Sequence, residues 1–414
     1  MANTTLTSSI ITKEALMVLE NQLTLAKNVT RKYDDKFSNE GAKIGTTINL
    51  RKPPRYLGRT GQALSVEGST ETFVPLTLDT QAGVDISFST ADLTLNIDEF
   101  KERFLVPAMA TVSNAIDVSI ANLYKDVFRY VNAGASATSY GTSGYLNDGT
   151  HNTLANVQGQ ILTAGAILTE TGVPTNQRAV VLDPVSQVSA ITPLTSLFNP
   201  SGKISGMFED ASLAANTLGF DWAADANIAQ FTPMTGGSVT ALSSAPASGA
   251  TTLAVTTTAG TVPRGTVLSM AGVYAINPQN RQTTGRLAQF VVTADTVVTT
   301  TGTLPIYPAY IPSGQFATCT GIPGGTAAIT IHSGAVGANP TSQNLAYNKG
   351  AFALATADLI LPQGVHFAAR EQYQGISMRI VQQYDINSDM LPCRIDVLYG
   401  VKTIYPELAV RLGG

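Results

Sequence analysis

The sequence is poor in charged residues. Asp, Glu, Lys and Arg make up 13% of its 414 residues, against about 25% in an average soluble domain. A solitary soluble protein usually carries more charge, which keeps its copies apart. A chain that buries much of its surface against copies of itself needs less charge, so the composition favours an assembly subunit. The net charge of −4 is too small to indicate a nucleic-acid or membrane partner.

Cysteine and histidine are also scarce. Cys319 and Cys393 are the two cysteines, and their separation matches neither a CxxC pair nor a zinc-site spacing. We expect both thiols to be reduced, as in a cytoplasmic product. The three histidines, His151, His332 and His366, stand singly and form no HExxH motif. The sequence therefore predicts no metal centre and no cofactor.

No apolar run approaches the 18 residues that a membrane-spanning helix needs. The opening MANTTLTSSIITKE has neither a basic segment nor an uninterrupted apolar segment, so it does not have the pattern of a signal peptide. The sequence thus predicts a protein made in the cytoplasm without membrane contact.

Motifs of catalysis are missing as well: no GxSxG or GxGxxG occurs. Asp385, Asn387, Asp389 and Asp396 match four positions of a calcium loop, but Met390 replaces its required glycine. A polar hairpin turn explains these residues better. An enzyme is the least favoured of the functions considered.

The longest helical pattern runs from Asp98 to Val131, with apolar residues at steps of four or three that share one helix face. Asp98 suits the N-cap, and Glu99 and Glu102 complement the helix dipole in the first turn. Pro107 predicts a bend between a short first helix and a longer second one. We expect a spine helix over residues 98–133, against which other elements pack.

Before this helix, two strand patterns at 47–50 and 72–78 flank a loose tip rich in Pro and Gly. The region carries the positive charges Lys43, Arg51, Lys52, Arg55 and Arg59. Tyr56 is the only aromatic residue among these charges, so base stacking with nucleic acid is poorly supported. An arm that reaches an acidic neighbour is the better functional interpretation, and a merely solvated loop is the alternative.

After the spine helix, residues 153–170 predict an amphipathic helix and residues 178–182 a buried strand; a further helix begins at Pro184. Strand alternating with helix indicates an α/β lobe. From 233 to 344 only four residues are charged, and short Val/Thr-rich strands alternate with Gly/Pro turns. This segment predicts an inserted β-barrel or sandwich. Residues 376–381 and 394–401 then predict two long antiparallel strands.

This order of elements resembles the major capsid proteins of tailed bacteriophages, which have the Hong Kong 97 fold. More narrowly, it is similar to podovirus coat proteins with an inserted β-barrel domain. The resemblance rests on these sequence segments: Arg264-Gly265-Thr266, Ala271-Gly272-Val273-Tyr274, Gln289-Phe290-Val291-Val292-Thr293, Arg379-Ile380-Val381-Gln382-Gln383-Tyr384-Asp385, Arg394-Ile395-Asp396-Val397-Leu398-Tyr399-Gly400-Val401 and Tyr405-Pro406-Glu407.

The resemblance implies an α+β fold in five parts. They are an N-terminal arm (1–37), an extended β loop (38–80), a peripheral domain with the spine helix (81–139 and 345–414), an axial domain (140–232) and an inserted β-barrel domain (233–344).

It also implies the function of a structural, non-enzymatic coat protein. Copies would assemble into hexamers and pentamers of an icosahedral shell around double-stranded DNA, bound without sequence specificity. A scaffolding protein and a portal are the further partners implied, and assembly would occur in the host cytoplasm. Two alternatives remain at this point: an encapsulin-like cellular compartment, which has the same fold, and a Thr-rich cell-surface adhesin, suggested by residues 233–344 alone.

The candidate subunit contact pairs two sets of charges. Arg51, Lys52, Arg55 and Arg59 on the extended loop would meet Asp98, Glu99 and Glu102 at the start of a neighbour's spine helix. Each exposed ion pair contributes only about 0.2–1 kcal/mol. Repetition around a closed symmetric interface would make the set important for register and partner choice.

Overall fold

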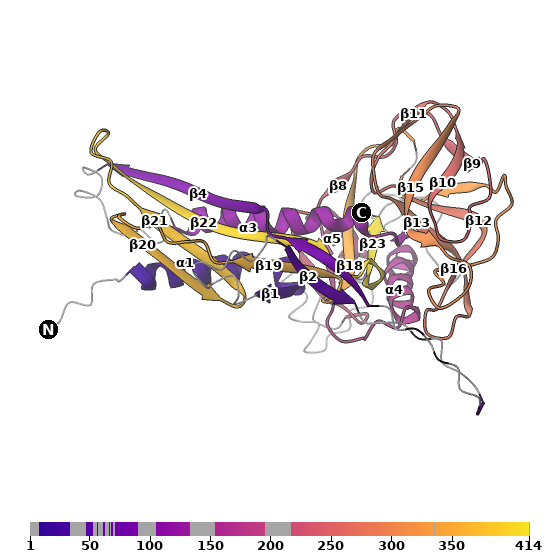
Figure 1. The fold of residues 1–414 in the computed structure, drawn as a ribbon, viewed down its shortest axis with the longest axis horizontal. Coiled ribbons are helices and arrows are strands. Elements are labelled where there is room, and N and C mark those ends of the chain that lie inside the picture. Colours follow the sequence, from indigo (N-terminus) through magenta and orange to yellow (C-terminus); the bar gives the residue numbers. More distant parts are fainter. Residues whose placement is uncertain are drawn as a thin grey trace. The chain divides into compact units, whose positions relative to one another are not determined.

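A computed structural model describes residues 8–33, 47–52, 56, 61–62, 66, 68, 71–89, 105–132, 154–194, 217–334 and 336–413 (Figure 1). The chain divides into two compact units. The first comprises Met1–Lys52, Phe73–Ile120 and Phe352–Ile404; the second comprises Pro53–Thr72, Ala121–Ala351 and Tyr405–Gly414. Each unit is described by itself.

The first unit is built on a six-stranded sheet of order β1-β19-β22-β21-β20, in which β4 also pairs with β22. The long strand β22 pairs antiparallel with β4 from Met390↔Ser89 to Tyr399↔Thr80, as Figure 1 shows. The predicted C-terminal strands are confirmed as the antiparallel pair β21 and β22. The strands are β1 (Thr30–Tyr33), β4 (Thr80–Ser89), β19 (Phe352–Ala357), β20 (Phe367–Tyr373), β21 (Ile376–Gln382) and β22 (Met390–Thr403).

Two glycines allow strands of this sheet to pass close to other backbone. A Cβ atom at Gly400 would collide with the carbonyl oxygen of Thr77, and one at Gly83 with that of Ile395. Both obstacles are backbone atoms, which cannot rotate away as a side chain can.

We therefore expect Gly400→Ala to lower the free energy of unfolding by about 1–3 kcal/mol, the usual cost of overpacking. Gly324→Ala is the matched control, because a Cβ there would meet nothing within 4 Å. Urea unfolding followed by circular dichroism measures both variants. Equal stability of the two would contradict the close approach at Gly400.

The N-terminal helix α1 (Ser8–Gln22) belongs to the body of the first unit. It packs against β20 and β21, and its apolar side chains Ala15, Leu16 and Leu19 are buried. A short 3-10 helix, η1 (Ala26–Asn28), follows and leads into β1. Tertiary packing therefore stabilises a helix that would be marginal alone in water.

The spine helix is shorter than predicted. Helix α3 runs over Val106–Ala121, a 3-10 helix η4 covers Asn122–Asp126, and β5 (Tyr130–Val131) follows, so the predicted helical stretch to residue 133 is wrong at its C-terminal end. β5 pairs parallel with β23 (Ala409–Gly413). Its two residues, Tyr130 and Val131, are fully buried. Because a buried strand is apolar as well, it extends the apolar pattern that predicts a helix from the sequence. Residues 98–104 lie outside the described residues.

The second unit contains an α/β lobe. Its sheet has the order β5-β23-β18-β6-β7, and β8 also pairs with β18. The predicted helix at 153–170, strand at 178–182 and helix from Pro184 are confirmed. These elements are α4 (Leu154–Glu170), β6 (Arg178–Leu182), α5 (Pro184–Leu194), β7 (Asp221–Ala224), β8 (Gln230–Phe231) and β18 (Thr341–Asn348).

Between β8 and β18 the chain forms an all-β domain. Strands follow the order β12-β13-β15-β10-β9, β17 pairs with β12, and an Ala241↔Ala328 bridge joins β9 to the residue before β17. The ring of strands is thus closed, which makes the domain a barrel. Its strands are β9 (Val239–Leu242), β10 (Ala250–Thr257), β11 (Gly260–Val262), β12 (Val267–Ile276), β13 (Thr283–Val292), β14 (Thr296–Val298), β15 (Thr301–Tyr310), β16 (Cys319–Thr320) and β17 (Ile329–Ile331).

The barrel has a core of its own, which includes Leu268, Phe290 and Leu304, all at most 1% exposed. Separately, β18 and β23 lie in the sheet of the lobe, although residues 345–414 are expected above to belong to the peripheral domain. The predicted boundaries of the five parts stay a prediction.

Candidate functional site: assembly surfaces and the barrel junction

The structure describes two of the seven predicted contact residues. Arg51 and Lys52 lie on β2 (Thr47–Lys52), with Arg51 exposed and Lys52 half-buried. β2 pairs only with β3 (Thr72–Thr77) among the described strands. An isolated two-stranded ribbon is marginally stable in water, so this ribbon gains from a surface to lie on. Arg55, Arg59, Asp98, Glu99 and Glu102 lie outside the described residues.

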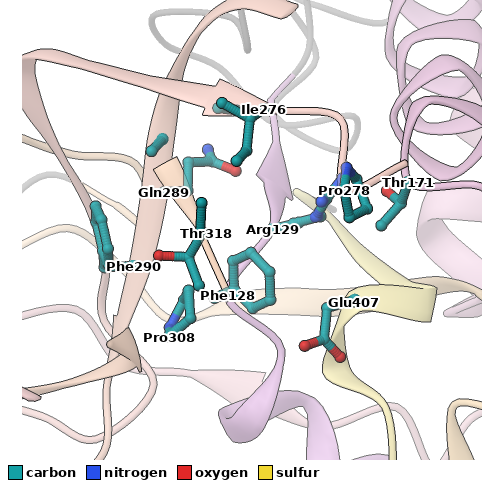
Figure 2. Close-up of a pocket in the computed structure, with 13 residues that line it drawn as sticks. Phe128, Arg129, Thr171, Ile276, Pro278, Gln289, Phe290, Pro308, Thr318 and Glu407 are labelled. Carbon is teal, nitrogen blue, oxygen red and sulfur yellow. The ribbon is translucent and has the colours of Figure 1, made fainter. Parts of the chain in front are cut away.

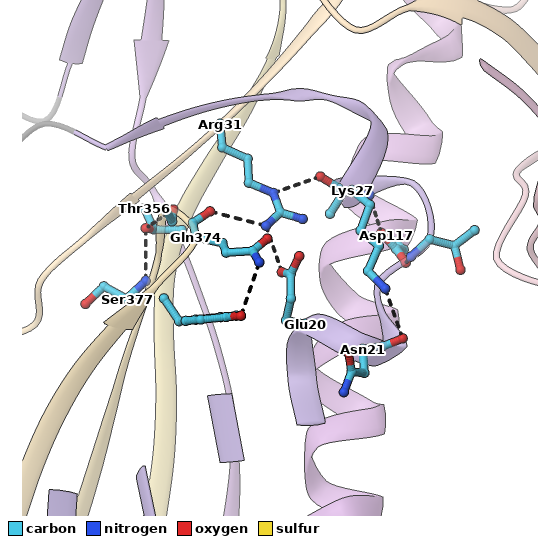
Figure 3. Close-up of polar contacts among 12 residues, drawn as sticks. Glu20, Asn21, Lys27, Arg31, Asp117, Thr356, Gln374 and Ser377 are labelled. Atoms are coloured by element: carbon cyan, nitrogen blue, oxygen red, sulfur yellow. Dashed lines mark hydrogen bonds and ion pairs between the residues drawn. The ribbon is translucent and has the colours of Figure 1, made fainter. Parts of the chain in front are cut away.

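Polar contacts that no sequence pattern indicates fix the N-terminal segment to α3. Asp117 on α3 is 1% exposed, and its two carboxylate oxygens accept hydrogen bonds from the backbone amides of Thr24 and Ala26, each at 2.9 Å (Figure 3). These amides lie between the end of α1 and the start of η1. The carboxylate therefore satisfies backbone N–H donors at and just before the start of η1, where a helix leaves such donors without intrahelical acceptors.

Arg31 joins three segments of the same unit (Figure 3). Its Nη1 atom lies 2.7 Å from a carboxylate oxygen of Glu20 on α1 and 3.2 Å from the carbonyl oxygen of Gln374 in the β20–β21 turn. Its Nε atom donates to the carbonyl oxygen of Ala26. Both side chains of the ion pair are about nine-tenths buried, so solvent screens the pair less than a surface pair.

A second polar centre lies in the second unit, where the barrel meets the lobe. Arg411 on β23 is fully buried; its Nη2 atom donates to the carbonyl oxygen of Gly265 at 2.6 Å. Its guanidinium lies over the rings of Tyr124 and Tyr130, 5.5 and 5.4 Å from their centroids. Cation–π contacts of this kind stabilise a desolvated cation. Burial lowers the pKa of Arg411 to about 10, so it stays charged at neutral pH.

Beside Arg411, the side chain of Gln289 on the barrel forms two hydrogen bonds with the backbone of β5, in the way that a neighbouring strand forms them. The amide nitrogen of Gln289 donates to the carbonyl oxygen of Tyr130 at 2.8 Å, and its amide oxygen accepts from the backbone N–H of Tyr130 at 2.9 Å. Gln289 is 4% exposed. The pair satisfies both backbone groups of Tyr130 that face the barrel, which links the barrel to the lobe.

Further contacts surround this centre. Phe128 packs edge-on against Tyr307 with ring centroids 5.9 Å apart, and Arg264 forms a 2.7 Å ion pair with Asp126. That ion pair is partly exposed, so it contributes little energy. Most of the junction's stability must come from its buried parts.

A small cleft opens beside the junction (Figure 2). Its interior volume is about 60 Å³, room for one or two water molecules. Arg129 and Glu407 bring opposite charges to its wall, with Phe128, Pro278 and Thr318 among the other lining residues. Arg129 is held by its own lobe, because its Nη1 atom donates to the carbonyl oxygen of Ile167. The cleft has the size of a gap between packed elements.

Over the described ranges, no three His, Cys, Asp or Glu side chains are placed to hold a metal ion. In the same part of the chain, no helix is long and apolar enough to cross a membrane. His332 is half-buried beside Ser269, and desolvation lowers its pKa to about 4, so it is neutral at pH 7.

A long helix, two sheets and a barrel inserted between two strands of the lobe are the elements expected above for a coat protein of the Hong Kong 97 type. The family model described as "P22 coat protein - gene protein 5" matches residues 1–414. The chain belongs to the P22 coat protein family. It is therefore a phage major capsid protein, a structural and non-enzymatic component of the icosahedral virion shell, which decides against the compartment and adhesin alternatives.

Other comparisons concern the fold alone. A solved chain from Mycobacterium phage Che8 is 12% identical, with a TM-score of 0.45 over 94% of this chain and 90% of that one. The capsid structure of cyanophage P-SCSP1u gives 9% identity and a TM-score of 0.47 over 89% and 84%. A virus-like particle from Pyrococcus furiosus gives 6% and 0.40 over 97% of both chains. No curated protein matches the chain. The assignment rests on the family match.

Proposed function

We propose that the basic side of the extended loop is the part of this coat protein that selects and aligns a neighbouring copy. The observation that carries the proposal is the β2–β3 ribbon, which stands outside the three larger sheets and presents Arg51 and Lys52 at its end. Arg55 and Arg59 follow directly in the sequence. Four like charges on one short segment suit an acidic partner surface.

The acidic partner in this proposal is the segment Asp98, Glu99 and Glu102 of the next subunit. The chain has more acidic than basic residues, 29 against 25. A basic loop is therefore opposite in sign to the net charge of a neighbouring copy, which attracts it. Repeated around rings of five and six subunits, pairs of about 0.2–1 kcal/mol each become decisive for register. The rings would close into the shell around double-stranded DNA, with a scaffolding protein and a portal as further partners.

Charge reversal tests the proposal. We expect a variant with Arg51, Lys52, Arg55 and Arg59 all replaced by Glu to form at least tenfold fewer shells, counted by negative-stain electron microscopy and a sizing column. Wild-type assembly should weaken at high salt, since exposed pairs are screened over about 10 Å at 0.1 M.

The control replaces the three arginines by Lys and leaves Lys52 unchanged, which keeps the charge and alters the geometry. We expect it to assemble as the wild type does. Assembly of the Glu variant at the wild-type level would overturn the proposal. If the wild-type chain alone stays monomeric, the same comparison is made with a scaffolding protein added.

A further inference from the structure

We propose that two turns of the barrel, at Arg281 and Gln315, form a binding site for the tip of the extended loop (Pro53–Thr72) of the same chain. This binding site is called the seat below. The tip and the barrel belong to the same compact unit. The Arg281 Nη2 atom donates to the carbonyl oxygen of Tyr56 at 3.1 Å. The Gln315 amide nitrogen lies 3.5 Å from the carbonyl oxygen of Gly68. Two separate turns of the barrel thus contact Tyr56 and Gly68, which lie twelve positions apart in the sequence.

The turn that presents Arg281 is fixed by its own hydrogen bonds. The backbone N–H of Arg281 donates to the carbonyl oxygen of Asn277 at 2.7 Å, and that of Asn277 donates to the carbonyl oxygen of Gln282 at 3.0 Å. Arg281 itself has a φ of +57°, a conformation that non-glycine residues seldom adopt. These bonds hold the backbone of the turn, and therefore the point from which the Arg281 side chain reaches the tip.

Both bonds to the tip end on backbone carbonyl oxygens, so these two bonds recognise the backbone of the loop. Apolar surface adds to it: Phe316 follows Gln315 and is 40% exposed, while Tyr56 and Val66 on the tip are 57% and 84% exposed. Such exposed apolar side chains can be covered when the tip settles more closely on the barrel.

Charge does not drive this contact. Between residues 233 and 344 the charged side chains are Arg264, Arg281, Arg286 and Asp295, so Asp295 is the one acidic side chain of the barrel that could attract the basic loop. The seat should therefore resist salt, whereas the subunit contact proposed above should weaken with salt. This difference separates the two proposals experimentally.

The seat would prepare the loop for assembly. A tip bound to its own barrel samples fewer conformations than a free one, so less entropy is lost when a neighbour binds the loop. In this respect the inference rests on the proposed function of the loop. The barrel would then act during assembly, beyond its place as a separate domain of the subunit.

Engineered cysteines test the seat, because Cys319 and Cys393 are buried. A Gly68→Cys/Gln315→Cys chain is treated with a short bismaleimide, and the products are separated on a denaturing gel and identified by mass spectrometry. We expect crosslinks within single chains, at least fivefold above a Gly68→Cys/Gly324→Cys control, in both 50 mM and 1 M NaCl. Yields at the control level, or crosslinks only between chains, would overturn the proposal.

Arg281→Ala provides a second readout. Added to the Gly68→Cys/Gln315→Cys chain, it should lower the crosslink yield at least threefold without changing the melting temperature. An unchanged yield would remove Arg281 from the seat. The Arg51→Glu/Lys52→Glu pair should lower assembly and leave the crosslink intact. Loss of assembly together with control-level crosslinking would therefore overturn the seat while the proposed subunit contact stands.

Discussion

Replacement of Arg411 by Ala is expected to lower the free energy of unfolding by about 3–5 kcal/mol, because truncation of a large buried side chain leaves a cavity, at about 2–5 kcal/mol, and a buried acceptor without its donor, at about 1–3 kcal/mol. The change leaves the carbonyl oxygen of Gly265 without its donor and opens a cavity between the rings of Tyr124 and Tyr130. The measurement is urea unfolding, followed by circular dichroism and by the fluorescence of Trp222, the only tryptophan.

Arg411→Met is the matched control for this prediction. Methionine fills a similar volume without a charge to desolvate, and such replacements of buried ionic groups are often neutral. We expect it to recover more than half of the loss. A change below about 1 kcal/mol in the alanine variant would show that the guanidinium is not a structural centre. Equal losses in both variants would assign the effect to the hydrogen bond to Gly265.

The second large effect is expected for Asp117→Ala. The variant leaves the buried amide of Ala26 and the half-buried amide of Thr24 without acceptors, and an unsatisfied buried donor costs about 1–3 kcal/mol. We expect a loss of about 3 kcal/mol in the free energy of unfolding. Amide exchange at residues 24–26 should accelerate at least a hundredfold, because the segment would open locally before the unit unfolds.

Asp117→Asn tests the geometry of the same site. Its amide offers one acceptor oxygen in place of two, so one backbone amide stays bonded. We expect its stability to lie between those of the wild type and the alanine variant. If exchange at residues 24–26 stays as slow as in the wild type in both variants, Asp117 does not anchor the N-terminal segment.

Local patterns predicted the lobe and the barrel strands well, because short elements bounded by Gly and Pro carry their signals locally. The helix at 154–170 and the strand at 178–182 were found in this way. The end of the spine helix was not. Val127 and Val131 fit a helical period of four, yet Val131 lies in a strand paired with Leu412, far away in the sequence. A fully buried residue gives no periodicity that separates helix from strand.

The two buried polar centres, at Asp117 and at Arg411, could not be predicted from the sequence. Asp117 sits one position after Ile116 in the helical pattern, where a polar residue usually faces solvent. Its partners, Thr24 and Ala26, come from a segment more than 90 residues earlier. Arg411 looks like an ordinary charge near the chain end, and only the packing of η4, β5 and β23 makes it buried. Contacts set by tertiary packing leave no local signal.

The strands that precede and follow the barrel in the sequence, β8 and β18, are paired with each other in the lobe. Thr341 of β18 pairs with Phe231 of β8, and Ser342 with Gln230, so the lobe could close its own hairpin there with a short turn. An ancestral subunit could have gained the barrel at this position, or lost it, without a break in the sheet. Only side chains already tied to the barrel, above all Arg411, would need to change with it. The same junction is a suitable insertion site for a foreign domain in place of the barrel in an engineered shell.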